Sequence, residues 1–215
     1  MDVGIKIILV VILPLMLLMA VIYGGAYVLK ERSNRSVYEY EVSISPEGDI
    51  SNFSVKVPFP ANLSDGGFSA PLDWVTEIDE EENMLLIEAD EMYGGSRNKV
   101  SLILESDNEI NTWDPLKEEP VLHPQADFNE CDPPSDSDAE RCYTYNYTDI
   151  AVIYESEDET EIEIIVELSG MNRWWILEEL ENQYHDSLIV SVEGQGEDDI
   201  EYEAEGNLKA GIGDY

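Results

Sequence analysis

The sequence is poor in basic residues. Its 215 residues include 11 Lys and Arg against 48 Asp and Glu, which gives a formal net charge of −37 at pH 7. Proteins that bind nucleic acid neutralise phosphates with clustered Lys and Arg side chains. Beyond residue 35 the basic residues are scattered among acids, at Lys56, Arg97, Lys99, Lys117, Arg141, Arg173 and Lys209. This scarcity excludes nucleic acid as a partner.

The chain also has little of the usual catalytic chemistry, with two His and two Cys. It contains no G-x-S-x-G or H-E-x-x-H motif and no phosphate-binding loop. His185, Asp186 and Ser187 carry the letters of a catalytic triad. However, neighbouring residues of a strand point to opposite faces and could not form the relay. The sequence therefore predicts no catalytic residue and no cofactor.

The excess of acids predicts a protein adapted to brine. In dilute buffer a charge of this size would repel itself and oppose a compact fold. At molar salt the screening length falls to about 3 Å, so carboxylates beyond nearest neighbours hardly interact. The alternative is an acidic disordered chain, but 43% of the residues are hydrophobic and they recur periodically. We therefore expect a folded protein from a halophilic organism.

One segment is apolar enough to contact the lipid bilayer along its whole length. Ile7 to Leu29 contains no charged residue, and a helix of this length reaches about 34 Å, enough to cross the hydrocarbon core. Gly24 and Ala26 would also fit the cleavage site of a signal peptide, but the apolar run is longer than is usual for one. We therefore expect an uncleaved single-pass anchor, with residues 1–35 forming the anchor and its flanks.

Two kinds of evidence disagree on the side of the membrane that the rest of the chain occupies. Basic residues after the span favour the cytoplasm. Glycosylation sequons and a pair of cysteines that could form a disulfide favour an extracellular, oxidising location. The basic residues are Lys30, Arg32 and Arg35. The cysteines are Cys131 and Cys142, and the sequon asparagines are Asn34, Asn52, Asn62 and Asn146. We expect a glycoprotein whose C-terminal domain lies outside the cell membrane.

Alternation of apolar and polar residues predicts strands. In the acid-rich stretch 160–168, Ile and Val side chains alternate with Glu, which is typical of a strand with one face in a core and one in water. Similar segments lie at 38–44, 53–59, 84–89, 100–105, 150–155, 188–193 and 200–205. With little predicted helix, they indicate an antiparallel two-layer β-sandwich over residues 36–215.

Two stretches depart from this alternation. Residues 107–146 are rich in Pro, Asp and Asn, and are predicted to form a long loop. Residues 172–185 place large side chains near helical spacing, which predicts a short helix or an aromatic-rich loop with Asn172 as a possible N-cap.

Candidate sites are weak against the acidic background. Asp132, Asp136, Asp138 and Glu140 could offer oxygen ligands to calcium, but their spacing is not that of an EF-hand loop. Acids beside Trp174 and Trp175 could serve a carbohydrate-active hydrolase. We expect instead a non-enzymatic envelope protein whose domain makes protein contacts; a hydrolase and a calcium-dependent adhesion module are the alternatives.

Several short stretches suggest a relationship. They are Trp113-Asp114-Pro115, Glu119-Pro120-Val121-Leu122, Cys131 with Cys142-Tyr143, Glu167-Leu168-Ser169-Gly170 with Asn172, and Gly211-Ile212-Gly213-Asp214-Tyr215. With them, the chain resembles short haloarchaeal membrane-anchored proteins without an assigned activity. The resemblance implies a location in an archaeal cell envelope and supplies no catalytic residue.

Overall fold

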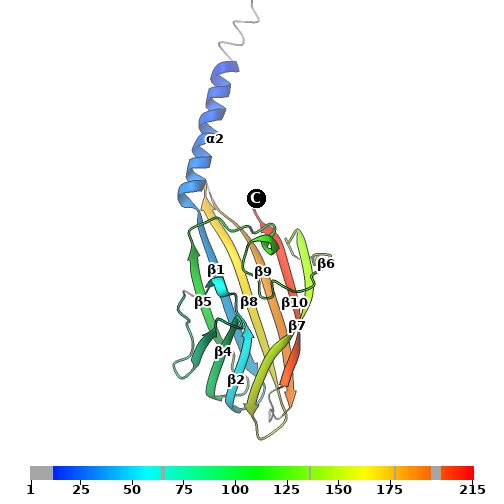
Figure 1. Ribbon diagram of the computed structural model, residues 1–215. Coiled ribbons are helices and arrows are strands. Elements are labelled where there is room, and N and C mark those ends of the chain that lie inside the picture. Colours follow the sequence, from blue (N-terminus) through cyan, green and yellow to red (C-terminus); the bar gives the residue numbers. More distant parts are fainter. Residues whose placement is uncertain (1–11, 64–65, 136, 177, 195–199) are drawn as a thin grey trace, which may run out of the picture.

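The computed structural model describes residues 12–63, 66–135, 137–176, 178–194 and 200–215. One helix, α2 (Leu13–Ser33), leads into a β domain (Figure 1). The domain also contains two short 3-10 turns, η2 (Ala61–Leu63) and η3 (Pro115–Lys117). The strands are β1 (Arg35–Pro46), β2 (Ile50–Pro58), β3 (Val75–Asp79), β4 (Met84–Met92), β5 (Asn98–Ser106), β6 (Asn129–Cys131), β7 (Arg141–Glu155), β8 (Thr160–Trp175), β9 (Glu179–Gly194) and β10 (Ile200–Gly213).

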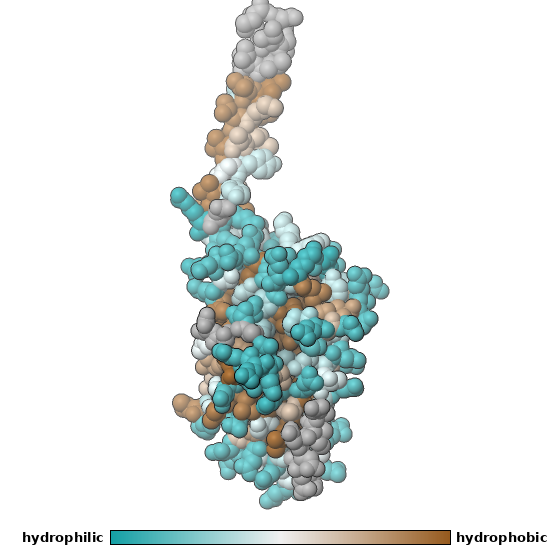
Figure 2. All heavy atoms as spheres, in the orientation of Figure 1, coloured by the Kyte–Doolittle hydropathy of each residue, from teal (hydrophilic) through white to brown (hydrophobic). Residues whose placement is uncertain are grey.

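The α2 helix is apolar and stands clear of the β domain. Its stretch Leu13–Lys30 is long and apolar enough to cross a membrane, and none of it is buried inside the protein. Figure 2 shows its mostly hydrophobic surface above a largely hydrophilic domain. Pro14 lies in the first turn, where the backbone N–H has no partner within the helix. The helix fits the predicted anchor, and residues 7–11 of the predicted span lie outside the described residues.

The described strands form a single antiparallel sheet, so the protein is mainly β as predicted. Their order is β3-β4-β2-β7-β10-β9-β8-β1-β5, and β6 pairs with β7. The eight segments predicted as strands coincide with strands of this sheet, except that Phe59, the last residue of one segment, follows β2. The short strands β3 and β6 were not predicted.

The sheet is curled. β1 and β2 follow each other in the chain, yet four strands separate them in the sheet. Nevertheless Tyr40 of β1 and Phe59, just after β2, pack edge to face with their ring centroids 5.0 Å apart. The Tyr40 hydroxyl also donates to the Pro58 carbonyl at 2.9 Å. The two arms of the sheet therefore face each other across a shared core.

The acid-rich segment of β8 lies as the alternation predicted. Ile162, Ile164 and Val166 are fully buried, whereas Glu163 is exposed and Glu161 is half-buried. The burial of aliphatic side chains is the main favourable term in folding. The intervening carboxylates remain in water, where each can be hydrated.

The prediction of a helix or loop over residues 172–185 is wrong. β8 continues through Trp175, and β9 returns from Glu179. Burial alternates along the segment, with Asn172 and Trp174 buried and Arg173 exposed. Pairing with β1 on one side and β9 on the other keeps these residues extended. Asn172 is therefore a buried strand residue and does not cap a helix.

The loop predicted over residues 107–146 is shorter in the structure. It contains η3 and β6, and it ends at residue 140 because β7 begins at Arg141. Its first part, residues 107–128, crosses the end of the sheet nearest to α2 (Figure 1). The position of this part depends on side chains of β8 and β9.

Candidate functional site at the junction of helix and sheet

The inward-facing residues of β9 are polar at the end of the strand next to α2 and apolar further from it. Leu188, Val190 and Val192 are buried in the core. Towards the helix, the inward residues are Asn182, Tyr184 and Asp186, which are also buried. Buried polar groups must be hydrogen-bonded, since an unsatisfied group costs about 1–3 kcal/mol. The partners of these side chains identify what the end of the sheet is built to hold.

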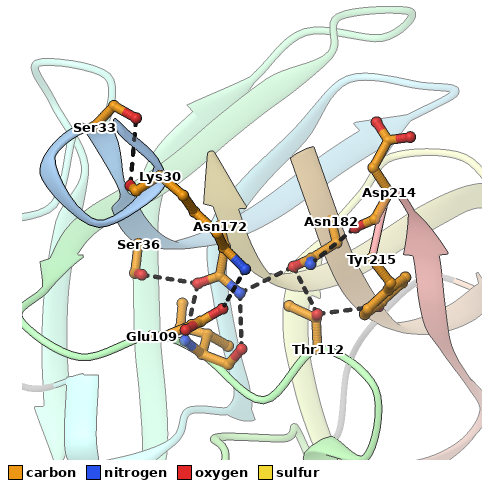
Figure 3. Close-up of polar contacts among 10 residues, drawn as sticks. Lys30, Ser33, Ser36, Glu109, Thr112, Asn172, Asn182, Asp214 and Tyr215 are labelled. Atoms are coloured by element: carbon orange, nitrogen blue, oxygen red, sulfur yellow. Dashed lines mark hydrogen bonds and ion pairs between the residues drawn. The ribbon is translucent and has the colours of Figure 1, made fainter. Parts of the chain in front are cut away.

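Asn172 of β8 satisfies its whole hydrogen-bonding capacity in this region (Figure 3). Its Oδ1 accepts from the Ser36 hydroxyl at 2.8 Å and from the Ile110 N–H at 2.9 Å. Its Nδ2 donates to the Ile110 carbonyl at 2.8 Å and to Oδ1 of Asn182 at 2.9 Å. An amide side chain offers two donors and two acceptor positions, so none is left over. One side chain therefore joins β1, β8, β9 and the loop.

Asn182 extends the same network to the last described residues (Figure 3). Its Oδ1 also accepts from the Thr112 hydroxyl at 2.7 Å, and its Nδ2 donates to the Asp214 carbonyl at 3.0 Å. The Thr112 and Tyr215 hydroxyls lie 3.0 Å apart. The loop and the end of β10 are thereby fixed to the same pair of asparagines.

Tyr184 and Asp186 hold a second part of the loop. The Tyr184 hydroxyl donates to the Pro120 carbonyl at 2.6 Å, and the Leu122 N–H donates to Asp186 Oδ2 at 2.8 Å. The ring of Tyr184 lies against Gly170 on β8, where a Cβ atom would come within 2.2 Å of the ring. Glycine is thus required there for the tyrosine to reach the loop.

Asp186 is an acid in an apolar setting. It is fully buried, and Tyr145 donates to its Oδ1 at 2.7 Å. Burial raises the pKa of Asp186 from 3.8 to about 6, and the hydrogen bonds from Leu122, Tyr145 and Ser187 oppose the rise. The ionised Asp186 side chain therefore lowers the stability of the fold in a pH-dependent way, which a surface carboxylate would not do.

The last turn of α2 is tied to the same end of the sheet. The Trp175 N–H donates to the Ser33 hydroxyl oxygen at 2.8 Å, and that hydroxyl lies 3.1 Å from the Trp175 carbonyl. The Lys30 ammonium lies 4.7 Å above the ring of Trp174 and 3.5 Å from a carboxylate oxygen of Glu109. Asn34 is the single residue between α2 and β1. α2 is therefore joined to the sheet by the chain itself at Asn34, and by side-chain contacts with β8 and with the loop.

The predicted disulfide is present, while the other predicted ligands are dispersed. Cys131 on β6 is bonded to Cys142 on β7, with their Cα atoms 5.0 Å apart. Among the residues that the structure describes, no three His, Cys, Asp or Glu side chains lie where they could hold one metal ion. Asp132, Asp138 and Glu140 thus do not gather into a calcium site, and Asp136 lies outside the described residues.

The four sequon asparagines differ in exposure. Asn52, Asn62 and Asn146 are exposed, as a glycan would require. Asn34 is half-buried in the joint between α2 and β1, and its Oδ1 is buried without a described hydrogen-bond partner. Asn34 is thus less exposed than the other three sequon asparagines.

A Ser, a His and a Glu meet on the outer face of the sheet, a set that reading the sequence missed. The Ser169 hydroxyl lies 2.9 Å from Nδ1 of His185, and Nε2 of His185 lies 3.5 Å from Glu167. β8 is paired with β1 and β9 on its two sides here, so its backbone N–H groups belong to the ladder. They cannot stabilise an oxyanion, which nucleophilic catalysis at Ser169 would need. Only the register of β8 and β9 could have revealed this contact.

Two cavities contain acids but are lined by no tryptophan. One, of about 710 Å³, is lined by residues that include Asp49, Glu91 and Glu157, at turns away from α2. The other, of about 530 Å³, includes His123 and Asp149. The hydrolase alternative required acids converging beside Trp174 and Trp175, and these cavities give it no support.

Replacement of Asn172 with Ala tests the network. It would leave the Ser36 hydroxyl and both backbone groups of Ile110 without this partner and remove one of the two donors to Asn182 Oδ1, so we expect a loss of about 2–4 kcal/mol in the free energy of unfolding. Chemical denaturation of the full chain in detergent measures this. Asn129→Ala is the matched control, because Asn129 is exposed and should shift the value by no more than about 0.5 kcal/mol. Equal effects of the two variants would contradict the structural role of Asn172.

Replacement of Asp186 with Asn tests the buried acid. The folded protein holds the Asp186 proton more tightly than the unfolded chain does, so this group makes the wild type lose stability as the pH rises from about 4 to about 6. Relative to Asp186→Asn, the wild type should lose about 3 kcal/mol between acidic and neutral pH. Denaturation curves over this range provide the measurement. Glu163→Gln, on the outer face of β8, should keep the wild-type pH dependence, and an Asp186→Asn variant that also keeps it would refute the assignment.

The contacts at this end of the domain form one closed unit that includes the last turn of α2. Its buried Asn172, Asn182, Tyr184 and Asp186 have structural partners within the protein, and its outer rim carries aromatic and basic residues. The geometry supports a joint that fixes the domain relative to the helix. No family model, curated protein or solved structure matches the chain.

Proposed function

We propose that this chain is a single-pass membrane protein whose β domain is held in one orientation at the outer surface of the cell membrane, where it makes contacts with other envelope proteins. The observation that carries the proposal is the joint. Asn34 alone separates α2 from β1. Ser33 and Lys30 contact the C-terminal end of β8, and Lys30 also contacts Glu109 in the loop. A helix that spans the bilayer would therefore orient the whole sheet.

A fixed orientation suits a contact function that involves no reaction. A domain on a flexible linker samples many orientations, and binding to a partner must then overcome the entropy lost when the domain is ordered. Here the membrane and the joint supply that order beforehand. The same faces of the sheet would always be presented to partners in or beside the membrane.

We propose that the curled sheet packs as the two layers of a sandwich, which the contact between Tyr40 and Phe59 supports. We also propose a halophilic, archaeal cell envelope as its location. The carboxylates on the outer faces of strands, such as Glu163, support it because a hydrated acidic surface is tolerated where salt screens its charge.

Glycopeptide mapping of the protein from its native cells tests the side of the membrane. We expect glycans on Asn52, Asn62 and Asn146, whose side chains are exposed, and none on Asn34, which is half-buried in the joint. Asn34 is thus an internal control on the same chain. Unmodified asparagines at all four positions, together with protection of the domain from protease added to intact cells, would place it on the other side.

Crosslinking on the same cells tests the contact function. A crosslinker that does not cross membranes should give discrete products with the wild-type chain. A variant with a Gly-Ser segment inserted between Ser33 and Asn34 should give fewer of them, because its domain no longer keeps one orientation. The absence of any product from the wild type would contradict the contact role.

A further inference from the structure

We propose that the end of the β domain next to α2 rests in the headgroup layer of the bilayer that α2 spans, with Trp113, Trp175 and Tyr215 as its interfacial side chains. This inference rests on the proposed function, because it requires α2 to cross the membrane. It adds a second membrane contact, made by the domain itself. The partner is lipid: the polar and glycerol region just outside the hydrocarbon core.

The exposed aromatic residues of the domain are concentrated at this end. Among the described Trp and Tyr residues of the β domain, four are largely exposed. Trp113 (45% exposed), Trp175 (54%) and Tyr215 (61%) lie at the end next to α2, and Tyr93 lies in a turn away from it. Tyr and Trp favour the membrane interface because they combine an apolar ring with a polar group. The headgroup layer of a bilayer accommodates both the apolar ring and the polar group, and would explain why these Trp and Tyr side chains are exposed.

The depth of Trp175 follows from the helix. The apolar run ends at Leu29, and Ser33 lies four residues further, which is about 6 Å along a helix. The polar layer on each side of the hydrocarbon core is about 5–7 Å thick. Because the Trp175 N–H is hydrogen-bonded to the Ser33 hydroxyl, its backbone lies at the depth of this layer when Leu29 lies at the edge of the hydrocarbon.

Trp113 and Tyr215 lie at the same end of the domain, further along the hairpin from Ser33 than Trp175 does. The Asp214 N–H donates to the Glu181 carbonyl at 2.8 Å, which holds the end of β10 beside the hairpin of β8 and β9. The rings of Trp113 and Tyr215 pack edge to face with centroids 5.2 Å apart. Figure 1 shows the C-terminal end of the chain beside the base of α2. Trp175 and the Trp113–Tyr215 pair therefore lie at the same end of the domain as the base of α2.

An independent observation points to an anion at the same place. Arg35 and Arg173 occupy directly opposite positions on β1 and β8, and both are exposed. Like charges directly opposite each other destabilise a sheet. In a chain with 11 basic residues, this pair is unexpected unless a negative group lies nearby. Glu181 contacts Arg173 at 3.2 Å, and a lipid phosphate would supply a second negative group for Arg35 and for the neighbouring Arg32.

The end next to α2 also carries exposed acids, Glu178, Glu179 and Glu181 among them, but it combines them with the arginine pair and two exposed tryptophans. The described residues of the opposite end include Tyr93 and Arg97 but no exposed tryptophan. The turns that line the cavity away from α2 carry Asp49, Glu155, Glu157, Asp158 and Glu159. A membrane surface would repel these carboxylates or remain separated from them by water. The exposed tryptophans and the arginine pair therefore favour the end next to α2 as the one that faces lipid.

The full chain reconstituted in vesicles of phosphatidylcholine tests the proposal. Insertion of α2 is measured first, as resistance to extraction with alkaline carbonate. Tryptophan fluorescence is then compared between ordinary vesicles and vesicles whose acyl chains are brominated next to the headgroup, at about 1 M salt to screen the acidic domain. We expect quenching in the brominated vesicles. Most of it should be lost in the double variant Trp113→Phe, Trp175→Phe, with Trp174 accounting for the remainder.

The control variant is Trp74→Phe, because Trp74 precedes β3 and lies outside the loop and the hairpin next to α2. It should keep the wild-type quenching. A chain that carbonate extracts contradicts the proposed membrane anchor. A chain that stays inserted but is not quenched, or a double variant that is quenched like the wild type, overturns the lipid contact and leaves the anchor standing.

Discussion

The need to satisfy buried polar side chains at one end of the sheet determines the arrangement of the rest. Asn172, Asn182 and Asp186 point into the protein where strand neighbours further along are aliphatic. Each would cost about 1–3 kcal/mol for every group left unpaired. Residues 110–122 supply the partners, through the backbone of Ile110 and Leu122 and the hydroxyl of Thr112. The loop is therefore a required part of the fold, and it closes the end of the curled sheet beside α2.

The closure also connects the domain to its helix. Glu109, next to Ile110, lies within 3.5 Å of the Lys30 ammonium, and Ser36, two residues after Asn34, donates to Asn172. The same asparagine thus orders the loop and the first residues of β1. The contacts of α2 itself, made by Ser33 and Lys30, are exposed. Exposed ion pairs contribute little individually, so the buried hydrogen bonds of Asn172 dominate the attachment of β1 and the loop to the sheet. The acids of the outer faces take no part in it.

The sequence predicted the elements that follow an apolar–polar alternation and missed those that do not. β8 was found over residues 160–168 because Ile162, Ile164 and Val166 alternate with acids. Its continuation, within residues 172–185, predicted a helix or loop because large side chains recur there near helical spacing and Asn172 could cap a helix. The buried positions of that segment keep the period of a strand, but hydropathy does not show it. The partner that makes Asn172 tolerable, Ile110, is 62 residues away along the chain.

The curl of the sheet and the candidate site were also beyond a reading of the sequence. Both depend on pairing between distant strands, such as the register that places Arg35 opposite Arg173. The disulfide between Cys131 and Cys142 could be predicted because only two cysteines are present and they lie close together in the chain. The calcium candidate came from acids that are common throughout this chain, and the described ones do not converge.

The central claim is that α2 and the β domain form one rigid body. Spin labels at Val21 in α2 and Ile103 on β5, both exposed positions, allow the distance between helix and domain to be measured in reconstituted vesicles. The account predicts a single narrow distance distribution, which broadens when a Gly-Ser segment is inserted between Ser33 and Asn34. A wild-type distribution as broad as that of the insertion variant would contradict it.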